Sequence, residues 1–268
     1  PTMYAHPAVV DNVAQLRARG VMLLGPTEGS TACGEEGLGR MLEPEEIVEK
    51  IAAAFRAPHK SKNILITLGP TRSKIDPVRF ISNRSSGIMG ASLCWAAYEN
   101  GYDVTAICGP TDVVLPRDIQ VIRVQTAREM ADTAIRLWPR SDVYIGTAAV
   151  LDWDIKHAAT TKLKKKDGTP KLELDKNPDI LAQISQTKTK KQFVLGFAAE
   201  TNDALSHAFL KLKEKQCDAL FVNDVSQHTQ GFESDLNSGF WLTLPDQIIS
   251  FPLCSKAELA RQLISKLC

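Results

Sequence analysis

The feature that most constrains the fold of this chain is a regular alternation of short apolar runs with longer amphipathic segments. The apolar runs are rich in Val, Ile, Leu and Phe and lie at 64–68, 104–108, 121–124, 143–149, 193–197 and 219–222. Helical patterns occupy the intervals at 86–99, 127–138, 179–185 and 203–215. Strands that alternate with helices predict a mainly parallel sheet with helices on both faces.

The end of the chain departs from this alternation. Two apolar segments, 240–244 and 249–253, follow each other closely and predict an antiparallel addition to the sheet. A last helix is predicted at 256–267. The predicted fold class is therefore α/β: a Rossmann-like, mainly parallel sheet with helices on both faces and an antiparallel C-terminal addition.

A separate block precedes the alternating region. Its pattern predicts, in order, a helix at 8–19, a short strand at 21–24, a glycine-rich loop at 25–39 and a helix from Pro44. The block has few apolar positions from which to build a core of its own. A polar stretch at 56–62 is typical of a linker. We therefore divide the chain into domains at 1–57 and 58–268.

The composition excludes several function classes. The chain has 268 residues and a net charge of +1, so it has no excess of positive charge that would attract nucleic acid. No apolar run approaches the ~20 residues that a membrane-spanning helix needs. The six cysteines form no CxxC pair, so metal-ligand spacing is absent, and their spread is typical of reduced thiols. We expect a cytoplasmic protein without nucleic-acid or membrane partners.

The first strand–helix junction is dense in hydrogen-bond donors. Ser85, Ser86 and Gly87 lie where the next helix should begin, and Gly87 and Gly90 allow close approach of a phosphate or of the sheet. Unpaired backbone N–H groups and the helix dipole at such a start favour an anion. A helix cap with packing glycines is the alternative explanation. The junction lacks G-x-G-x-x-G, so the dinucleotide fingerprint is not satisfied.

Two later segments carry charge. Asp152 follows the predicted strand 143–149 and can hold Mg²⁺ beside nucleotide phosphates, although a turn or cap aspartate explains it equally. The lysine run at 162–166 is typical of a solvated loop. Its position after Asp152 equally suits a mobile loop that closes on phosphates.

Two further segments allow either a structural or a ligand-binding role. In Lys176-Asn-Pro-Asp-Ile, Asn177 and Pro178 end a strand, and Pro178 and Asp179 fit the start of a helix. That explanation is complete without a ligand. Phe197 ends another strand and either covers a nucleotide base or belongs to the core, and the pattern favours the core.

Taken together, these segments resemble one known family. The motifs GPTR, DPVRFISNRSSG, AAVLDW, KLKKK, KNPDIL, GFAAET, and NDVS followed by GFESDLN occur in this order. Over residues 62–268 the chain resembles the synthetase half of the bifunctional coenzyme A biosynthesis protein, phosphopantothenoylcysteine decarboxylase/synthetase. Each motif is weak alone, and their order carries the resemblance.

The first block resembles the end of the decarboxylase half of the same family. MYAHPAVVDN, GPTEGSTACGEEGLGRM and EPEEIV carry this resemblance, and segment 32–41 resembles the substrate clamp, with Cys33 as its reactive cysteine. The flavin-binding part and the catalytic histidine of that half find no match, and His6 stands in the wrong context to replace the histidine. The resemblance therefore implies that this chain binds no FMN and does not decarboxylate.

The resemblance implies a phosphopantothenate–cysteine ligase. CTP activates 4′-phosphopantothenate to an acyl-cytidylate with release of pyrophosphate. L-Cysteine then forms the amide and releases CMP. Such a reaction needs alignment and neutralisation of two anions rather than an enzyme nucleophile. CTP is the implied cosubstrate and Mg²⁺ the implied cofactor.

The family's functional residues fall on positions of this chain by motif. The implied catalytic residues are Asn83 and Lys162. The implied substrate-binding residues are Arg79, Asn83, Ala148, Ala149 and Lys162. The implied nucleotide-binding residues are Ser85, Ser86, Gly87, Asp152, Lys162, Lys176, Asn177, Pro178, Asp179, Ile180 and Phe197. Asp152 is also the implied metal ligand.

Departures from the family pattern leave two alternatives open. Ile88 stands where the family often has lysine, and Arg84 stands where histidine is common, which puts one phosphate contact in doubt. One alternative is an NAD(P)-binding Rossmann oxidoreductase, against which the missing fingerprint counts. The other is a non-catalytic phosphopantothenate-binding subunit, against which retention of Asn83, Asp152 and Lys162 counts. The family also implies a homodimer, with the late strands as plausible interface material.

Overall fold

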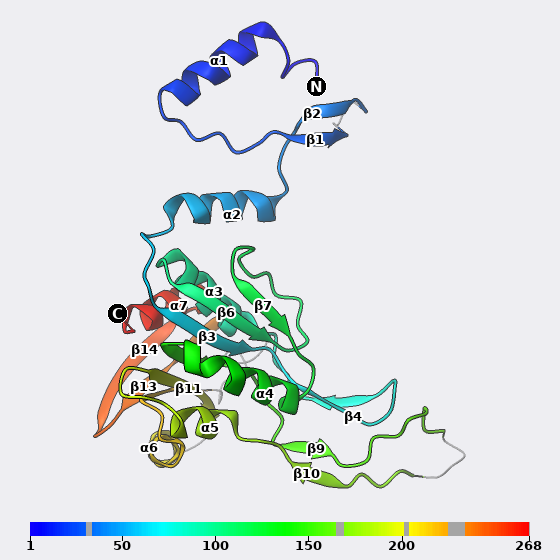
Figure 1. Ribbon diagram of the computed structural model, residues 1–268, viewed down its shortest axis with the longest axis vertical. Helices are drawn as coiled ribbons and strands as arrows, with labels where there is room; N and C mark the ends of the chain where they lie inside the picture. Colours follow the sequence, from blue (N-terminus) through cyan, green and yellow to red (C-terminus); the bar gives the residue numbers. More distant parts are fainter. Residues whose placement is uncertain (31–33, 165–168, 201–203, 225–233, 268) are drawn as a thin grey trace. The chain divides into compact units, whose positions relative to one another are not determined.

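The chain forms two compact units, Pro1–Arg56 and Ala57–Cys268. The computed structural model describes residues 1–30, 34–164, 169–200, 204–224 and 234–267 (Figure 1). Three sequence predictions fall wholly or partly outside the described residues: the Cys33 position, the end of the lysine run, and the segment that joins NDVS to GFESDLN.

The Pro1–Arg56 unit contains two helices and a small hairpin. The elements are α1 (Pro7–Ala18), β1 (Thr27–Ser30), β2 (Glu36–Arg40) and α2 (Pro44–Phe55). The strand predicted at 21–24 is wrong, and two strands lie inside the predicted glycine-rich loop. The strands form there because β1 and β2 pair with each other, Gly29 opposite Gly37. Local apolar character makes a strand only where a partner strand is available.

The Ala57–Cys268 unit is built on one eight-stranded sheet, in the order β14-β13-β12-β11-β8-β3-β6-β7. Six strands run parallel: β3 (Asn63–Leu68), β6 (Asp103–Cys108), β7 (Gln120–Arg123), β8 (Val143–Gly146), β11 (Phe193–Glu200) and β12 (Ala219–Asp224). The last two, β13 (Leu236–Thr243) and β14 (Gln247–Ser255), are antiparallel. The predicted fold class is confirmed.

The order of the six parallel strands positions the site. Numbered along the chain, they lie in the order 3-2-1-4-5-6, the doubly wound Rossmann arrangement. The order reverses between β3 and β8, which are neighbours in the sheet. Loops leave these two strands toward opposite faces, so a crevice opens beyond their carboxyl ends. The fold thus predicts a ligand site at the β3–β8 junction.

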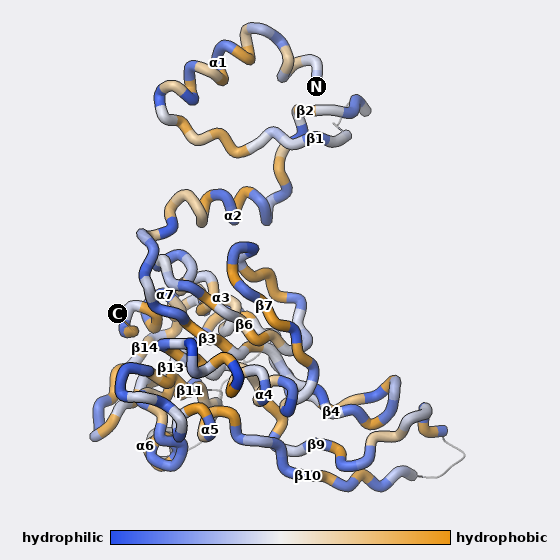
Figure 2. Tube along the Cα trace, in the orientation of Figure 1, coloured by the Kyte–Doolittle hydropathy of each residue, from blue (hydrophilic) through white to orange (hydrophobic). Residues whose placement is uncertain are grey.

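Helices cover both faces of the sheet. One face carries α3 (Ile88–Glu99) and α7 (Lys256–Ser265), and the other carries α4 (Ala127–Leu137), α5 (Ile180–Gln186) and α6 (Ala204–Lys215). β3 is buried at every position but its first, because a central parallel strand is covered on both sides. Its neighbours are likewise mainly hydrophobic (Figure 2). None of the described helices is long and apolar enough to cross a membrane.

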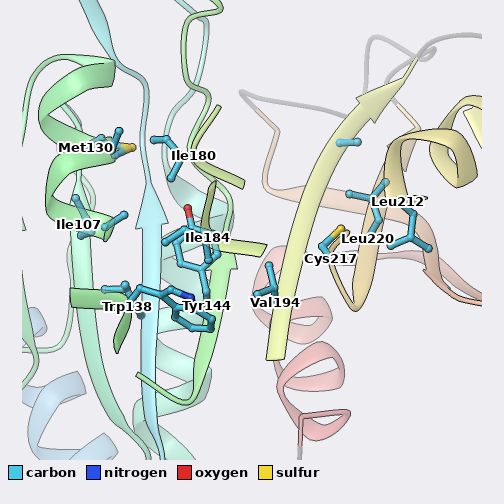
Figure 3. Close-up of a cluster of buried hydrophobic side chains, with 14 of the residues drawn as sticks. Ile107, Met130, Trp138, Tyr144, Ile180, Ile184, Val194, Leu212, Cys217 and Leu220 are labelled. Atoms are coloured by element: carbon cyan, nitrogen blue, oxygen red, sulfur yellow. The ribbon is translucent and has the colours of Figure 1, made fainter. Parts of the chain in front are cut away.

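A large hydrophobic core lies between the sheet and the helices α4, α5 and α6 (Figure 3). Met130 from α4 and Trp138, which directly follows α4, meet Ile184 from α5 over the side chain of Tyr144 from β8. The Trp138 and Tyr144 rings pack edge to face, with centroids 6.2 Å apart. This packing holds the β8 strand, and with it the β8 loop, in place.

Two small antiparallel sheets project from the edge of the main sheet and form what we call the arm (Figure 1). It consists of β4 (Arg72–Lys74) paired with β5 (Phe80–Ser82), and β9 (Trp153–Ile155) paired with β10 (Leu174–Lys176). Ser73 of β4 donates a hydrogen bond to Asp154 of β9, which joins the two halves. The sequence patterns missed all four strands, because three residues are too few to show a period of two.

Candidate functional site

Two adjoining clefts open at the switch point of the sheet. The first cleft has an empty volume of about 890 Å³ and lies between the loop after β3, the start of α3 and the loop after β8. The second cleft, of about 800 Å³, lies between the β8 loop, the end of β10, the start of α5 and the C-terminal half of α6. Ala148, Val150, Phe197 and Lys211 line both clefts, so the two form one continuous surface.

Most of the residues singled out from the sequence line these clefts. The first cleft brings together Asn83, Ser85, Ser86, Gly87, Ala148, Ala149 and Phe197. The second cleft brings together Ala148, Asp152, Lys176, Asn177, Pro178, Asp179, Ile180 and Phe197. Asn83 and Phe197, 114 positions apart in the sequence, therefore meet along one edge of the sheet.

The start of α3 forms the anion-binding end of the first cleft. Gly87 is the N-cap and adopts a left-handed backbone with φ of +79°, a conformation that favours glycine. The amide of Ile88 donates to Ser86 Oγ at 3.4 Å, and Thr111 Oγ1 donates to the carbonyl of Ser86 at 2.5 Å. These contacts fix the loop, and the helix start presents backbone N–H groups and a positive dipole end to the cleft.

Gly90 lets α3 lie directly on the sheet. A methyl group at this position would lie 2.3 Å from Leu68 Cβ and 2.6 Å from Thr147 Oγ1, both far inside contact distance. Leu68 ends β3 and Thr147 begins the β8 loop. Gly90 therefore sets the distance between the anion-binding helix start and the two strands that flank the switch point.

We expect Gly90→Ala to weaken both folding and nucleotide binding. The added methyl must push α3 away from Leu68, which lowers the free energy of unfolding by about 1–3 kcal/mol and displaces the helix start. Denaturant unfolding and CTP affinity measure the two effects. Ser92→Ala, two residues along the same helix, is the matched control. Equal unfolding midpoints for Gly90→Ala and Ser92→Ala would contradict this account.

Asn83 ties the loop after β3 to the loop after β8. Its Nδ2 donates to the carbonyls of Ala149 at 3.3 Å and Val150 at 3.2 Å. The side chain is exposed at the mouth of the first cleft. It is therefore placed to touch a ligand while it holds the two loops in register.

The second cleft is framed by the segment that enters α5. Asn177 is 8% exposed; its Nδ2 donates to the carbonyl of Leu151 at 2.9 Å, and its amide donates to the carbonyl of Asp152 at 2.9 Å. Its Oδ1 is buried and has no hydrogen-bond partner within the described part of the chain. A buried acceptor without a partner costs free energy, so this wall suits a ligand that brings a donor.

Asp179 caps α5 and anchors a lysine from α6. Its Oδ1 accepts from the amide of Ala182 at 3.0 Å, and its Oδ2 accepts from Lys215. Burial alone would raise the pKa of Asp179, but the hydrogen bonds from Lys215 and Ala182 outweigh it and hold this pKa below its ordinary value. Asp179 therefore stays ionised and keeps the Lys215 ammonium group at the cleft.

The structure adds cleft residues that the sequence patterns missed: Lys211, Lys215, Asn223, Asn237 and Lys256. Lys211 and Lys215 are four positions apart on α6 and so lie on one face of the helix. The spacing of these two lysines, in a helix that follows a strand ending at the ligand edge, is the sequence signal from which they could have been found. Lys256 is 4% exposed; burial lowers its pKa, and Asp235 opposes that effect. Cationic groups therefore line both clefts.

Arg79 and Lys162 lie outside the walls of both clefts. Arg79 donates through Nε and Nη2 to Asp76 Oδ2, at 2.9 and 2.5 Å, and through Nη2 to the carbonyl of Leu163 at 3.1 Å. The amide of Leu163 in turn donates to Asp76 Oδ2 at 3.2 Å. The Asp76–Arg79 pair therefore anchors the loop segment that carries the exposed Lys162.

The second cleft offers the carboxylate oxygens of Asp152 to a divalent metal ion, but the described residues provide no complete set of protein ligands for one. Asp152 is exposed in the wall of the second cleft. Among the described residues, no group of three or more His, Cys, Asp or Glu side chains is placed to hold a metal ion. This donor set fits Mg²⁺ that arrives on a nucleotide, because Mg²⁺ is usually bound by one or two carboxylates together with substrate phosphates.

Comparison with known families divides the chain as its two compact units do. Residues 59–268 match the family described as the DNA/pantothenate metabolism flavoprotein C-terminal domain. Residues 1–56 match the family described as flavoprotein.

Individual relatives agree with the family match. The chain is 41% identical over 268 residues to the coenzyme A biosynthesis bifunctional protein CoaBC of Vibrio vulnificus (strain YJ016), covering 99% of this chain and 67% of that protein. It is 39% identical over 270 residues to the protein of the same description from Escherichia coli (strain K12), covering 66% of that protein. The chain thus spans about two thirds of the length of these relatives.

Solved structures agree as well. The crystal structure of the C-terminal domain of a coenzyme A biosynthesis bifunctional protein CoaBC superposes with a TM-score of 0.66 at 34% identity. The match covers 78% of this chain and 95% of that domain.

Proposed function

The chain belongs to the DNA/pantothenate metabolism flavoprotein C-terminal domain family, and from this we propose that it is a CTP-dependent phosphopantothenate–cysteine ligase of coenzyme A biosynthesis. One observation carries the proposal. The anion-binding start of α3, with Asn83 beside it, shares a wall with the cleft framed by Asp152 and the segment from Lys176 to Ile180. That surface can align two anionic substrates.

We place the nucleotide across both clefts. The triphosphate lies against Ser85, Ser86 and Gly87, where the helix start stabilises negative charge. Lys211, which lines both clefts, lies between the phosphate end and the base end. The second cleft holds the ribose and base. Asn177, whose Oδ1 lacks a partner in the described part of the chain, provides a buried acceptor in that wall.

This placement favours CTP over ATP. Cytosine and adenine both carry an exocyclic amino donor, but cytosine also has a ring carbonyl, which backbone N–H groups in the wall can read and which adenine lacks. Phe197 lines both clefts and packs on Phe221 with ring centroids 5.3 Å apart. It can therefore belong to the core on one side and cover a nucleotide base on the other, so the two interpretations from the sequence are compatible.

The activation step needs alignment and charge neutralisation. A carboxylate oxygen of 4′-phosphopantothenate attacks the α-phosphorus of CTP, the bond to pyrophosphate breaks, and an acyl-cytidylate forms. Asn83, with the Ala148 and Ala149 backbone, orients the acyl group beside the nucleotide. Lys162 closes over the reacting phosphate and stabilises the charge that develops on it.

The second step forms the amide. The amine of L-cysteine attacks the acyl carbonyl, the carbon–oxygen bond to CMP breaks, and the amine releases a proton. Asn83 remains beside the carbonyl as a hydrogen-bond donor. Mg²⁺, held by Asp152 and the nucleotide phosphates, supplies neutralisation of phosphate charge when bound.

Pyrophosphate release tests the function directly. We expect release with 4′-phosphopantothenate, Mg²⁺ and CTP that continues through many turnovers only when L-cysteine is added. ATP in place of CTP should support much less. No release with either nucleotide, from folded protein that still binds CTP, would favour the non-catalytic subunit. Binding of NADPH in preference to CTP would favour the oxidoreductase.

We further propose that 1–57 is the C-terminal remnant of a flavodoxin-like decarboxylase domain with its linker, and that 58–268 is the synthetase domain. The match of residues 1–56 to the flavoprotein family supports this division. In this 268-residue chain the remnant should hold no FMN, and stoichiometric flavin absorbance in the purified chain would contradict that. The cytoplasmic location stays a prediction.

We propose that the arm, rather than the late strands, forms the homodimer interface. It presents a cluster of exposed large hydrophobic side chains: Val78, Phe80, Ile81, Trp153, Leu172 and Leu174. Phe80 and Ile81 come from β5, Trp153 from β9 and Leu174 from β10, and Val78 and Leu172 lie in the chain beside these strands. Exposed apolar side chains gathered on one projecting segment are typical of a surface that another protein covers.

We expect Phe80→Asp to convert the dimer to a monomer, because it places a charge in the apolar patch of the arm. Light scattering at micromolar concentration measures the mass. Ile248→Asp, on the exposed side of β14, is the matched control and should leave the dimer intact. A monomer produced by Ile248→Asp alone would assign the interface to the late strands instead.

A further inference from the structure

A third cleft lies on the other side of the switch point, beyond the carboxyl ends of β6 and β7. It has an empty volume of about 730 Å³. Arg72, Thr111, Asp112 and Arg123 contribute to its walls, and none of the four lines the first or second cleft. In a doubly wound sheet each half can bind a mononucleotide. The first cleft lies between the loop after β3, the start of α3 and the β8 loop, and the second cleft uses the half that contains β8, β11 and β12, so the carboxyl ends of β6 and β7 lie outside both.

Two arginines face this third cleft without a carboxylate partner in the described part of the chain. Arg123 is exposed, and its Nη1 donates to the carbonyl of Thr111 at 3.3 Å. Arg72 is half-buried, and its guanidinium carbon lies 4.2 Å from the centroid of the Phe80 ring, which holds it in place. A planar guanidinium that is pre-positioned but not paired suits bidentate binding of a phosphate.

An acidic residue gives the cleft a second recognition element. Asp112 follows β6, the second strand of the doubly wound order, and is exposed in the cleft wall. At the corresponding place in dinucleotide-binding folds, a carboxylate accepts hydrogen bonds from ribose hydroxyls. Glu129 lies nearby, but its Oε2 accepts from the amides of Gln125 and Thr126 at the start of α4. Asp112 is thus the carboxylate in this wall that can accept hydrogen bonds from ribose hydroxyls.

We propose that the third cleft is a second nucleotide site, which takes a nucleoside monophosphate: Arg72 and Arg123 bind the phosphate and Asp112 binds the ribose. The site is connected to the first cleft. Arg123 donates to the Thr111 carbonyl, and Thr111 Oγ1 donates to Ser86 in the anion-binding loop. A ligand that draws Arg123 toward itself therefore acts on the loop that we assign to the triphosphate, and this coupling rests on the proposed function.

Adenosine 5′-monophosphate is the probe, titrated by calorimetry into the full chain already saturated with CTP and Mg²⁺. We expect binding under this condition. Arg123→Gln and Arg72→Gln should each weaken it about 10-fold or more, because each removes a charged hydrogen-bond donor. Arg128→Gln, on the first turn of α4 but outside the cleft wall, is the charge-matched control and should change affinity less than about 2-fold.

Inorganic phosphate separates the two recognition elements. Asp112→Asn should weaken binding of adenosine 5′-monophosphate and leave that of phosphate unchanged. CTP affinity of each variant reports that it is folded. The proposal is overturned if the monophosphate binds only in competition with CTP, or if the two arginine variants bind it as the control does. It survives a failed ligase assay, because binding is measured without turnover.

Discussion

Lys162→Gln should reduce ligase turnover by about 10³-fold while CTP affinity changes little. The ammonium group of Lys162 is exposed and lies outside both clefts in this structure, so it contributes little to ground-state binding. Its proposed role begins when its loop closes and its charge meets the charge that develops on the reacting phosphate. Loss of one such group typically lowers kcat by 10²–10³-fold. Steady-state pyrophosphate release and equilibrium CTP binding measure the two quantities.

Lys164→Gln is the matched control for this prediction. It removes the same charge two residues away, from a side chain that is also exposed. If the lysine run acted only through its summed charge, the two variants would lose activity equally. Equal and small losses would assign the run to a solvated loop, which is the structural explanation that the sequence left open.

Asp76→Asn should lower phosphopantothenate-dependent turnover by about 100-fold and leave CTP binding largely intact. Asp76 is 2% exposed and accepts from the amides of Val78, Arg79 and Leu163 as well as from the Arg79 guanidinium. The neutral side-chain amide of asparagine cannot balance the positive charge of Arg79. Its NH₂ group is also a donor, so it cannot accept the hydrogen bonds that the carboxylate oxygen accepts. The loop that carries Lys162 then loses its anchor, and a displacement of about 1 Å is enough for such a loss of rate.

The pH dependence of the anchor follows from the charge state of Asp76. The Arg79 side chain holds the pKa of Asp76 well below its usual range; burial opposes this, and the amides of Val78, Arg79 and Leu163 add to it. A lowered folded-state pKa means that the stabilisation is complete above the unfolded pKa of about 3.9 and is lost only as pH falls through the lower folded value. Turnover of the unmodified chain should therefore show no titration of this anchor between about pH 5 and 9.

The matched control for Asp76→Asn is Asp175→Asn, which removes a carboxylate from the exposed strand β10 of the same arm. It should keep nearly full turnover. Limited proteolysis between 156 and 164 should accelerate in Asp76→Asn and not in Asp175→Asn. A turnover loss without faster cleavage would mean that Asp76 acts on the substrate rather than on the loop.

Local patterns determined the fold class and the succession of strands and helices along the chain. β3 and β6 could be recognised because a strand covered on both faces is mainly apolar along its length. The helix starts at Thr126 and Asp179 follow from side chains that cap their own backbone, a contact made within a few residues. Pairing partners decided the remainder, which is why the strand at 21–24 was wrong and the arm was missed.

The site followed the same division. Ser85, Ser86 and Gly87 were found from the sequence, because they stand where the helix of the first strand–helix junction begins and the carboxyl ends of parallel strands meet at one edge. The ligand role of the segment from Lys176 came from the family resemblance. Asp76 and Lys211 were assigned no role from the sequence. Asp76 accepts from the amide of Leu163, 87 residues away, and Lys211 lines clefts whose other walls come from distant segments.

The sequence by itself determined the alternation of strands and helices, the family and the motif residues, because these rest on periodicity and on contacts within a few residues. Only the tertiary structure decided that Arg79 is paired with Asp76, that Lys211 lines both clefts, and that Arg72 and Arg123 share a third. The first of these facts depends on the burial of Asp76, and the other two depend on contacts between residues far apart in the sequence. A side chain in an open cleft or a salt bridge leaves no mark on local sequence pattern.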